Sequence, residues 1–176
     1  MLIKFKEHNY SVRNVKTLAA GPDGQPFSLT LCENDKPIAK VRDEGHGGGF
    51  DYEWLDKTAK ERMDKFLAAH PGFPSDPDDP NSEMLPLDAD ILVDELLTKF
   101  QAEKWLRGKC SKETLFRLDG DQEGTWRTVK APFDPKVKSY LDKKYGDKVQ
   151  EIANERFLPS PAATTSQDEA TGPSPR

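Results

Sequence analysis

The sequence predicts an α+β fold in which an antiparallel sheet, built from an N-terminal meander and a later hairpin, carries about four helices on one face. Three observations lead to this prediction. Short runs rich in β-branched and aromatic residues, separated by turn residues, occupy the first 43 positions. Two segments with helical apolar spacing follow, at residues 55–67 and 88–108. A second strand-turn-strand pattern then lies at residues 114–130.

The expected meander has strands at residues 2–6, 27–33 and 37–43. These runs either alternate polar and apolar residues or are rich in β-branched and aromatic side chains, as strands commonly are. Asn34 and Asp35, between the second and third runs, tolerate the left-handed backbone that a tight hairpin requires. The sequence therefore predicts antiparallel pairing across this turn.

The first two helices are expected on either side of a proline-rich segment. Asp56 can cap the first helix, whose apolar residues share one face and which ends before Pro71. The second and longest helix begins at Asp88 or Asp90 and ends near Gly108. Its length and apolar content place it at the centre of the core.

The last part of the domain combines a hairpin with two further helices. Residues 114–118 and 125–130 are the expected strands, joined by a turn with two glycines. Asp134 followed by Pro135 is typical of a helix N-terminus, and Gly146 ends that helix. Asp147 then opens a fourth helix that reaches Phe157.

One domain over residues 1–157 is expected, with an exposed acidic loop at residues 70–86 that contains five prolines. The alternative is two small subdomains divided at this loop. Residues 158–176 consist largely of Pro, Ser, Thr and Ala without an apolar period, which predicts a disordered tail.

The net charge of −5 over 176 residues conceals a division along the chain. Residues 43–95 contain 4 basic and 15 acidic side chains, whereas residues 104–148 contain 12 basic and 7 acidic ones. No run approaches the ~20 apolar residues of a membrane span. The two cysteines have no metal-ligand spacing, which is typical of a reducing compartment. We therefore expect a soluble cytoplasmic protein without a membrane partner.

Residues 45–49 contain four glycines beside several acidic side chains and one histidine. Oxygen and imidazole ligands suit divalent metals, and the candidates are Asp43, Glu44, His46, Asp51, Glu53 and Asp56. Their spacing matches no defined ligand set, and the glycines lack the pattern of a phosphate-binding loop. The sequence thus predicts neither a metal nor a cofactor here. The sequence favours a structural role for the glycines, which let the chain cross close over the sheet. The aromatic residues that follow then anchor the first helix.

Nucleophilic catalysis finds little support in the sequence. A pair formed by Cys32 and His46 is conceivable, but it belongs to no recognised nucleophile motif. Asp119 and Asp121 lie in a turn, where water keeps carboxyl groups near their ordinary pKa. No catalytic residue is assigned, and a non-enzymatic protein is favoured over an enzyme or small-ligand binder at the glycine-rich loop.

The basic segment offers a second function, nucleic-acid binding. Cations can contact phosphates and aromatic rings can stack on bases, and the candidate contacts are Arg117, Arg127, Lys130, Lys136 and Lys138. A solvated basic face is the structural alternative.

Several stretches resemble a group of uncharacterised small proteins encoded by tailed bacteriophages and prophages. The stretches are residues 39–48 (AKVRDEGHGG) with Tyr52 and Trp54, residues 115–121 (LFRLDGD), residues 124–130 (GTWRTVK), residues 143–146 (KKYG) and residues 152–155 (IANE). The group has no established activity, so the resemblance implies a phage context and a bacterial host cell rather than catalytic residues.

Small acidic phage proteins without an enzymatic motif often act by binding. The leading hypothesis is therefore a non-enzymatic interaction protein that inhibits or redirects a host or antiviral-defence factor through an acidic surface. The expected partner contacts are His46, Asp51, Tyr52, Glu53, Asp76, Asp78 and Asp79. The sequence does not indicate an oligomeric state.

Overall fold

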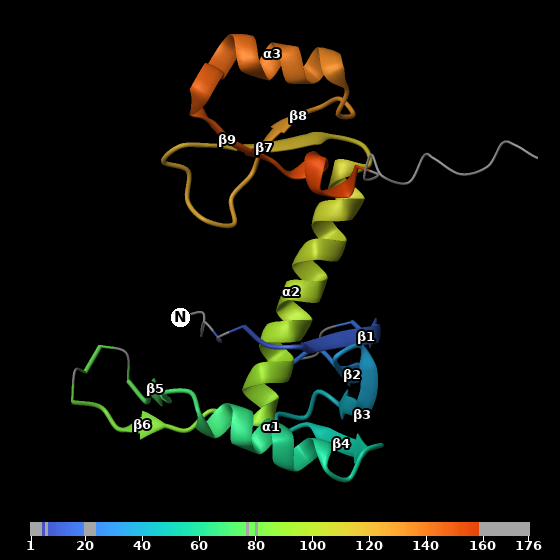
Figure 1. Ribbon diagram of the computed structural model, residues 1–176, viewed down its shortest axis with the longest axis vertical. Coiled ribbons are helices and arrows are strands. Elements are labelled where there is room, and N and C mark those ends of the chain that lie inside the picture. Colours follow the sequence, from blue (N-terminus) through green and yellow to red (C-terminus); the bar gives the residue numbers. More distant parts are fainter. Residues whose placement is uncertain (1–4, 6, 20–23, 77, 80, 159–176) are drawn as a thin grey trace, which may run out of the picture. The chain divides into compact units, whose positions relative to one another are not determined.

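The computed structural model describes residue 5 and residues 7–19, 24–76, 78–79 and 81–158. The chain divides into two compact units, unit 1 (residues 1–103) and unit 2 (residues 104–176). The boundary falls inside the longest helix, α2 (Ala89–Cys110) (Figure 1). Each unit has hydrophobic clusters of its own. Their charges differ in sign: unit 1 has 12 basic and 20 acidic side chains, and unit 2 has 14 and 11.

A four-stranded antiparallel sheet forms one side of unit 1, in the order β1-β2-β3-β4. Its strands are β1 (Tyr10–Thr17), β2 (Phe27–Glu33), β3 (Lys36–Asp43) and β4 (Asp51–Trp54). The predicted hairpin between β2 and β3 is confirmed: Glu33 pairs with Lys36, and Asn34 and Asp35 have φ angles of 49° and 64°. The side chains of the two turn residues therefore made this turn recognisable from the sequence.

Strands β1 and β4 differ from the expectation. Strand β1 was not predicted, since an irregularity in its pairing between Arg13 and Lys16 interrupts the alternation of polar and apolar residues. Residues 51–54 pair with β3 instead of leading into a helix, because Tyr52 and Trp54 turn toward the core while Asp51 and Glu53 face solvent. Most of the strand expected at residues 2–6 lies outside the described residues.

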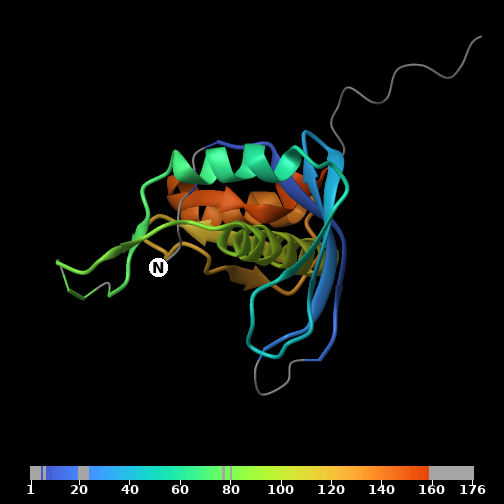
Figure 2. The same cartoon turned by 90° about the horizontal axis from the view of Figure 1, so that it is seen from below.

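Two helices bury the apolar face of this sheet. The predicted helix is confirmed as α1 (Ala59–Ala68), whose residues Met63 and Leu67 are buried. Its N-cap is Thr58 and not Asp56 as expected, because the Asp56 carboxylate accepts the Thr58 N–H, at 2.9 Å, ahead of the helix. Helix α2 starts as predicted, since the Asp88 carboxylate accepts the Ile91 N–H at 2.9 Å. One hydrophobic cluster contains residues of β1–β4, α1 and the first half of α2. Figure 2 shows α1 and α2 on the same side of the sheet.

The proline-rich acidic segment contains a short hairpin. Strand β5 (Phe73–Pro74) pairs with β6 (Met84–Leu85), and the backbone N–H of Ser75 donates to the Glu83 carbonyl at 2.8 Å. Gly72 permits this pairing, because a Cβ atom there would lie 2.1 Å from the Leu85 carbonyl oxygen. The segment expected as a loop is thus closed at its base by a two-residue ladder.

Unit 2 contains a three-stranded antiparallel sheet in the order β8-β7-β9. Its elements are β7 (Thr114–Leu118), β8 (Arg127–Val129), α3 (Pro135–Tyr145), β9 (Val149–Ile152) and a 3₁₀ helix (Ala153–Phe157). The second hairpin and the Asp134 cap are confirmed, since β7 pairs with β8 and Asp134 accepts the Val137 N–H at 2.7 Å. Leu115 and Phe116 of β7 belong to different hydrophobic clusters, so both faces of this sheet are covered.

The predicted fold class is wrong in two respects. The described residues contain three α-helices rather than about four, because residues 149–152 pair with β7 as a strand. Val149 and Ile152 are β-branched and fit this pairing, although their spacing also suits a helix. The meander and the later hairpin also form separate sheets instead of one, because both edges of β7 are occupied by β8 and β9. The helices therefore do not all lie on one face of one sheet.

Candidate functional site

The glycine-rich loop between β3 and β4 is shaped by its own backbone. Gly45 and Gly47 both have φ angles of 75°, a region that residues with a Cβ rarely adopt. The Asp43 carboxylate accepts the Gly45 N–H at 2.7 Å and closes the start of the loop. At its end, a Cβ atom on Gly49 would lie 3.1 Å from Oδ2 of Asp90. The glycines thus allow the chain to pass close to the start of α2.

Tyr52, one of the expected partner contacts, uses its hydroxyl group within the protein. The hydroxyl donates to Oδ1 of Asp90 at 2.8 Å, and the ring stacks on Trp54 with 5.4 Å between ring centroids. Burial, together with the negative charge of Asp90, raises the pKa of Tyr52 well above its ordinary value. This side chain therefore acts as an anchor between β4 and α2.

Asp51 and Glu53 lie on the opposite, polar face of the sheet. Glu53 pairs with Lys40 at 2.9 Å and Asp51 with Arg42 at 3.4 Å, across neighbouring strands. These exposed pairs line a shallow groove of about 540 Å³, whose remaining polar side chains include Ser28 and Thr30. The acidic side chains are therefore partly neutralised by basic neighbours, which lowers their contribution to an acidic surface.

His46 is exposed in the glycine-rich loop, and the structure separates it from Cys32. The loop follows Asp43, which pairs with Phe27 at the start of β2, whereas Cys32 pairs with Pro37 near the other end. Five strand residues span about 17 Å. Cys32 is also fully buried, and burial raises the pKa of its thiol. The suggested Cys32–His46 pair is therefore wrong.

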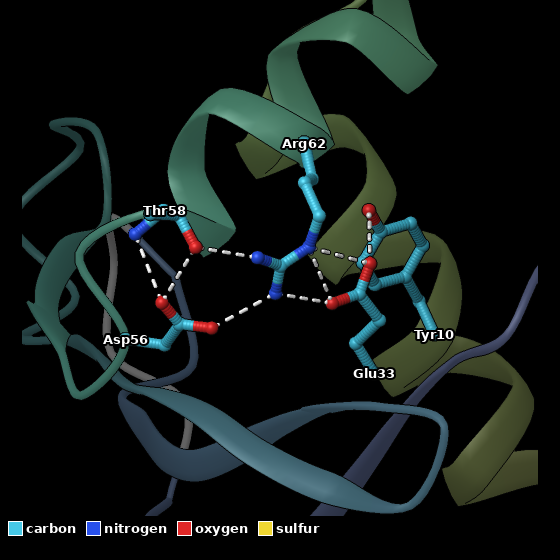
Figure 3. A network of polar contacts seen from close by, with 5 residues as sticks. All are labelled: Tyr10, Glu33, Asp56, Thr58 and Arg62. Atoms are coloured by element: carbon cyan, nitrogen blue, oxygen red, sulfur yellow. Dashed lines mark hydrogen bonds and ion pairs between the residues drawn. The ribbon is translucent and has the colours of Figure 1, made fainter.

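Asp56, a candidate metal ligand in the sequence, belongs to an ion-pair network centred on Arg62 (Figure 3). The Arg62 guanidinium donates to Asp56 at 2.9 Å and to Glu33 at 2.6 Å, and Glu33 also accepts the Tyr10 hydroxyl at 3.4 Å. Hydrogen bonds from Arg62 and from Thr58 lower the pKa of Asp56 to about 2. This network joins α1 to the end of β2.

Among the described residues, no group of three or more His, Cys, Asp or Glu side chains is arranged to hold a metal ion. The carboxylates near the glycine-rich loop bond to four separate groups: Asp43 to a backbone N–H, Glu44 and Asp51 to Arg42, Glu53 to Lys40, and Asp56 to Arg62. They do not converge on one point. None of the helices in the described part of the chain is long and apolar enough to cross a membrane.

The remaining expected contacts, Asp76, Asp78 and Asp79, lie in the loop between β5 and β6 and are exposed. The Asp76 carboxylate accepts the Asp78 N–H, and the Asp79 carboxylate accepts the Asn81 N–H, both at 2.9 Å. These bonds shape the loop locally and leave its negative charges in solvent. Figures 1 and 2 place this hairpin and β4 on opposite sides of unit 1, so the expected contacts form two separate groups.

The β5–β6 hairpin, residues 73–85, is called the acidic hairpin below. Its strand β6 lines a groove that the sequence did not predict. One wall is the face of α1 that carries Asp64 and Leu67, and the other is the segment from Met84 to Asp88. Its volume is about 680 Å³. The only sequence signal was the pair Met84-Leu85, two large apolar residues in an otherwise acidic and proline-rich segment.

The basic segment of unit 2 is extensively ion-paired. Three of the five candidate nucleic-acid contacts have carboxylate partners: Arg117 with Glu151 at 2.9 Å, Arg127 with Asp121 at 2.7 Å, and Lys138 with Glu155 at 2.6 Å. Hydrogen bonds from Arg127 lower the pKa of Asp121 to about 2. Lys130 and Lys136 are exposed. The structure therefore does not bring the five cations together as one unneutralised surface.

The guanidinium carbons of Arg117 and Arg156 lie 5.3 and 5.7 Å from the ring centroid of Trp126, and both guanidinium groups also pair with Glu151. Each cation lies within reach of the indole face. The ring is half-buried beside Leu106 and Leu115, so it belongs to the packing of unit 2.

Comparison of the chain with protein-family models, with curated proteins and with solved structures found no significant match.

Proposed function

We propose that the protein is a non-enzymatic binding protein that captures a basic surface of a host or antiviral-defence factor through the acidic hairpin of unit 1. The observation that carries this proposal is the charge of residues 71–95. This segment contains eight acidic side chains and no lysine or arginine. Three of the acidic residues, Asp76, Asp78 and Asp79, are exposed in the β5–β6 loop.

The local geometry of the hairpin supports recognition by a partner. The base of the loop is closed by the β5–β6 ladder, and the carboxylates of Asp76 and Asp79 hold turns within it. Backbone that is restrained by such hydrogen bonds loses less conformational entropy on binding than unrestrained backbone. Its charges act over the Debye length of about 8–10 Å at physiological salt, which favours encounter with a basic partner.

The bonding of the other titratable groups also favours binding over catalysis. The carboxylates beside the glycine-rich loop are engaged in structural bonds, and the Tyr52 hydroxyl bonds to Asp90. A catalytic group requires a reactive atom positioned near a substrate site. Binding of a basic partner requires only exposed negative charge, and the acidic hairpin has such charge.

The phage context and action inside the bacterial host cell are parts of this proposal that rest on the sequence resemblance. A protein of this kind needs no catalytic residues to inhibit or redirect a host factor. It needs a surface whose charge complements that of its target, and the acidic hairpin supplies one. Nucleic-acid binding by unit 2 is less well supported, because three of its five candidate cations have carboxylate partners.

The test is a triple variant, Asp76→Asn, Asp78→Asn and Asp79→Asn, used as bait in a bacterial lysate. Asparagine keeps the side-chain oxygen that each turn requires, so the variant removes charge without removing the turns. The matched control neutralises three exposed acids of unit 2, Asp119, Asp142 and Asp147. We expect wild type and control to capture the same basic protein and the hairpin variant to lose it. Equal capture by all three would overturn the proposal.

A further inference from the structure

The groove between α1 and the segment from Met84 to Asp88 combines apolar walls with carboxylates. Leu67 of α1 and Leu87, on opposite walls, are its buried apolar lining residues. Met84 and Leu85 line it with exposed fractions of 55% and 37%, which is high for large apolar side chains. Asp64 and Asp88 lie along the same groove. An apolar strip bordered by carboxylates is therefore open to solvent.

The backbone holds one wall of this groove firmly in place. Gly72 lies so close to the Leu85 carbonyl oxygen that no side chain fits between them. On the other wall, Leu67 is buried in the core of unit 1, while Ala68 and Asp64 remain exposed. Both walls of the groove are thus formed by residues of unit 1.

The charged residues that line the groove indicate the chemistry of a partner that would bind there. Its single lysine, Lys60, is paired with Asp64 at 2.7 Å, and its other acidic residues are Asp88 and Asp90. His70 also lines the groove. The other six acidic residues of segment 71–95 add further negative charge, and this segment contains no lysine or arginine. An acidic partner chain would be repelled by these carboxylates. A purely polar partner chain would leave the apolar strip exposed to solvent. A chain with both lysines and large apolar side chains would complement both properties.

We infer that the groove docks an extended basic segment of a partner protein, in which large apolar side chains alternate with lysine or arginine. The apolar side chains cover Met84 and Leu85, and the cations face Asp64, Asp88 and the acidic hairpin. This inference rests on the proposed function, because it names the chemistry of the partner that the hairpin attracts. It adds a specific apolar contact to an attraction that charge alone would supply.

Two fluorescein-labelled nonapeptides test the inference by fluorescence anisotropy: one alternates lysine with leucine, and the other alternates lysine with serine. Both carry the same charge, so their difference in affinity reports the apolar contact. Burial of one or two leucine side chains should make the lysine-leucine peptide bind wild type at least about tenfold more tightly. The double variant Met84→Ser and Leu85→Ser should remove this difference. Leu18→Ser with Leu55→Ser, two exposed leucines outside the groove, is the matched control and should preserve it.

A second pair of variants tests the same site without touching Met84 or Leu85. Ala68→Arg places a cation in the groove, whereas Ala69→Arg adds the same charge to an exposed neighbour that does not line it. We expect only the first to weaken lysine-leucine binding, by about tenfold or more. Circular dichroism checks that all variants remain folded.

The possible outcomes separate the inference from the proposed function. Equal affinity of wild type for both peptides, or no binding of either, overturns the groove inference. So does an unchanged preference in both the double-serine variant and Ala68→Arg. If the triple asparagine variant of the hairpin then still weakens both peptides, charge capture by the hairpin stands while docking in the groove fails. If the hairpin variant binds both peptides like wild type while the groove variants lose the preference, the proposed role of the hairpin fails instead.

Discussion

The Tyr52 hydroxyl donates a hydrogen bond of 2.8 Å to the Asp90 carboxylate, 38 positions further along the chain. The second oxygen of Asp90 accepts the Phe50 N–H at 3.0 Å. One carboxylate in the first turn of α2 therefore holds both the end of the glycine-rich loop and strand β4. Acceptance of a backbone N–H and a hydroxyl satisfies both oxygens of a half-buried group.

Tyr52→Phe should lower the free energy of unfolding by about 1.5–3 kcal/mol, the usual range for a hydrogen bond to a charged group. Asp90→Ala should cost more, because it leaves both the Phe50 N–H and the Tyr52 hydroxyl without their acceptor. Urea unfolding followed by circular dichroism measures both. Tyr140→Phe, at an exposed tyrosine of α3 whose hydroxyl accepts a hydrogen bond from Lys144 at 2.9 Å, is the control. Water can replace that exposed bond, so stability should change by less than about 0.5 kcal/mol. An unchanged urea midpoint for Tyr52→Phe would contradict this account.

Gly45→Ala should destabilise the protein, whereas Gly48→Ala should not. Gly45 has a φ of 75°, and a Cβ atom there would lie 2.8 Å from the Pro26 ring. The left-handed backbone alone costs about 1–2 kcal/mol for a residue with a Cβ. Gly48 has open space around it and no such backbone, so alanine there is expected to be neutral or to stabilise by about 0.4–1 kcal/mol. Thermal unfolding of the two variants compares them, and equal midpoints would contradict the structural role of Gly45.

His8 should make the protein less stable as the pH falls below 6.5. Burial, followed by repulsion from Lys99, lowers the pKa of this histidine from the ordinary value of 6.5. The unfolded chain therefore binds a proton more readily than the folded protein. The stabilisation is fully present above pH 6.5 and decreases as the pH falls through that value.

The pH dependence is measured as the free energy of unfolding between pH 7.5 and 5.5. His8→Phe keeps a ring beside Phe66 and cannot be protonated, so we expect a shallower decline than in wild type. His46→Phe, in the exposed loop, is the matched control for replacing a histidine by phenylalanine. Identical slopes for all three proteins would exclude His8 as the source.

Arg62→Met should raise the pKa of Asp56 from about 2 toward its ordinary value of 3.8. The hydrogen bond from Arg62 is the largest cause of the low pKa, and methionine keeps much of the side-chain length while removing the charge. In wild type this carboxylate stabilises the fold above pH 3.8 and loses that effect as the pH falls toward 2. An NMR titration of the Asp56 carboxyl carbon measures the shift, with Asp121 as the internal control. An unchanged Asp56 titration would mean that its bonds to Thr58 suffice.

Gel retardation of DNA and RNA should be weak, because Arg117, Arg127 and Lys138 are paired with carboxylates. Each of these cations would have to exchange a partner within the protein for a phosphate. We expect no shift at 150 mM salt and at most a diffuse one at low salt. A discrete complex whose affinity decreases steeply with salt, and which Lys130→Glu with Lys136→Glu abolishes, would favour the nucleic-acid alternative.

The elements that could be predicted are those whose signals lie within a few residues. Asn34 and Asp35 indicated the hairpin of β2 and β3, and Asp134 with Pro135 indicated the start of α3. These signals act through local backbone preferences, so neighbouring residues are sufficient. The exposure of the acidic hairpin was also predictable, because prolines and carboxylates favour solvent over a core.

Other features depended on partners far away in the chain. Residues 149–152 suit a helix or a strand by spacing, and pairing with the edge of β7 that β8 does not occupy makes them a strand. Tyr52 could have faced a partner, but Asp90 supplies an acceptor on the core side of the sheet. The groove beside Met84 exists only because α1 lies opposite it. Local backbone preferences and charge are properties of short segments, whereas strand pairing, ion pairing and the shape of a groove arise from contacts between distant residues.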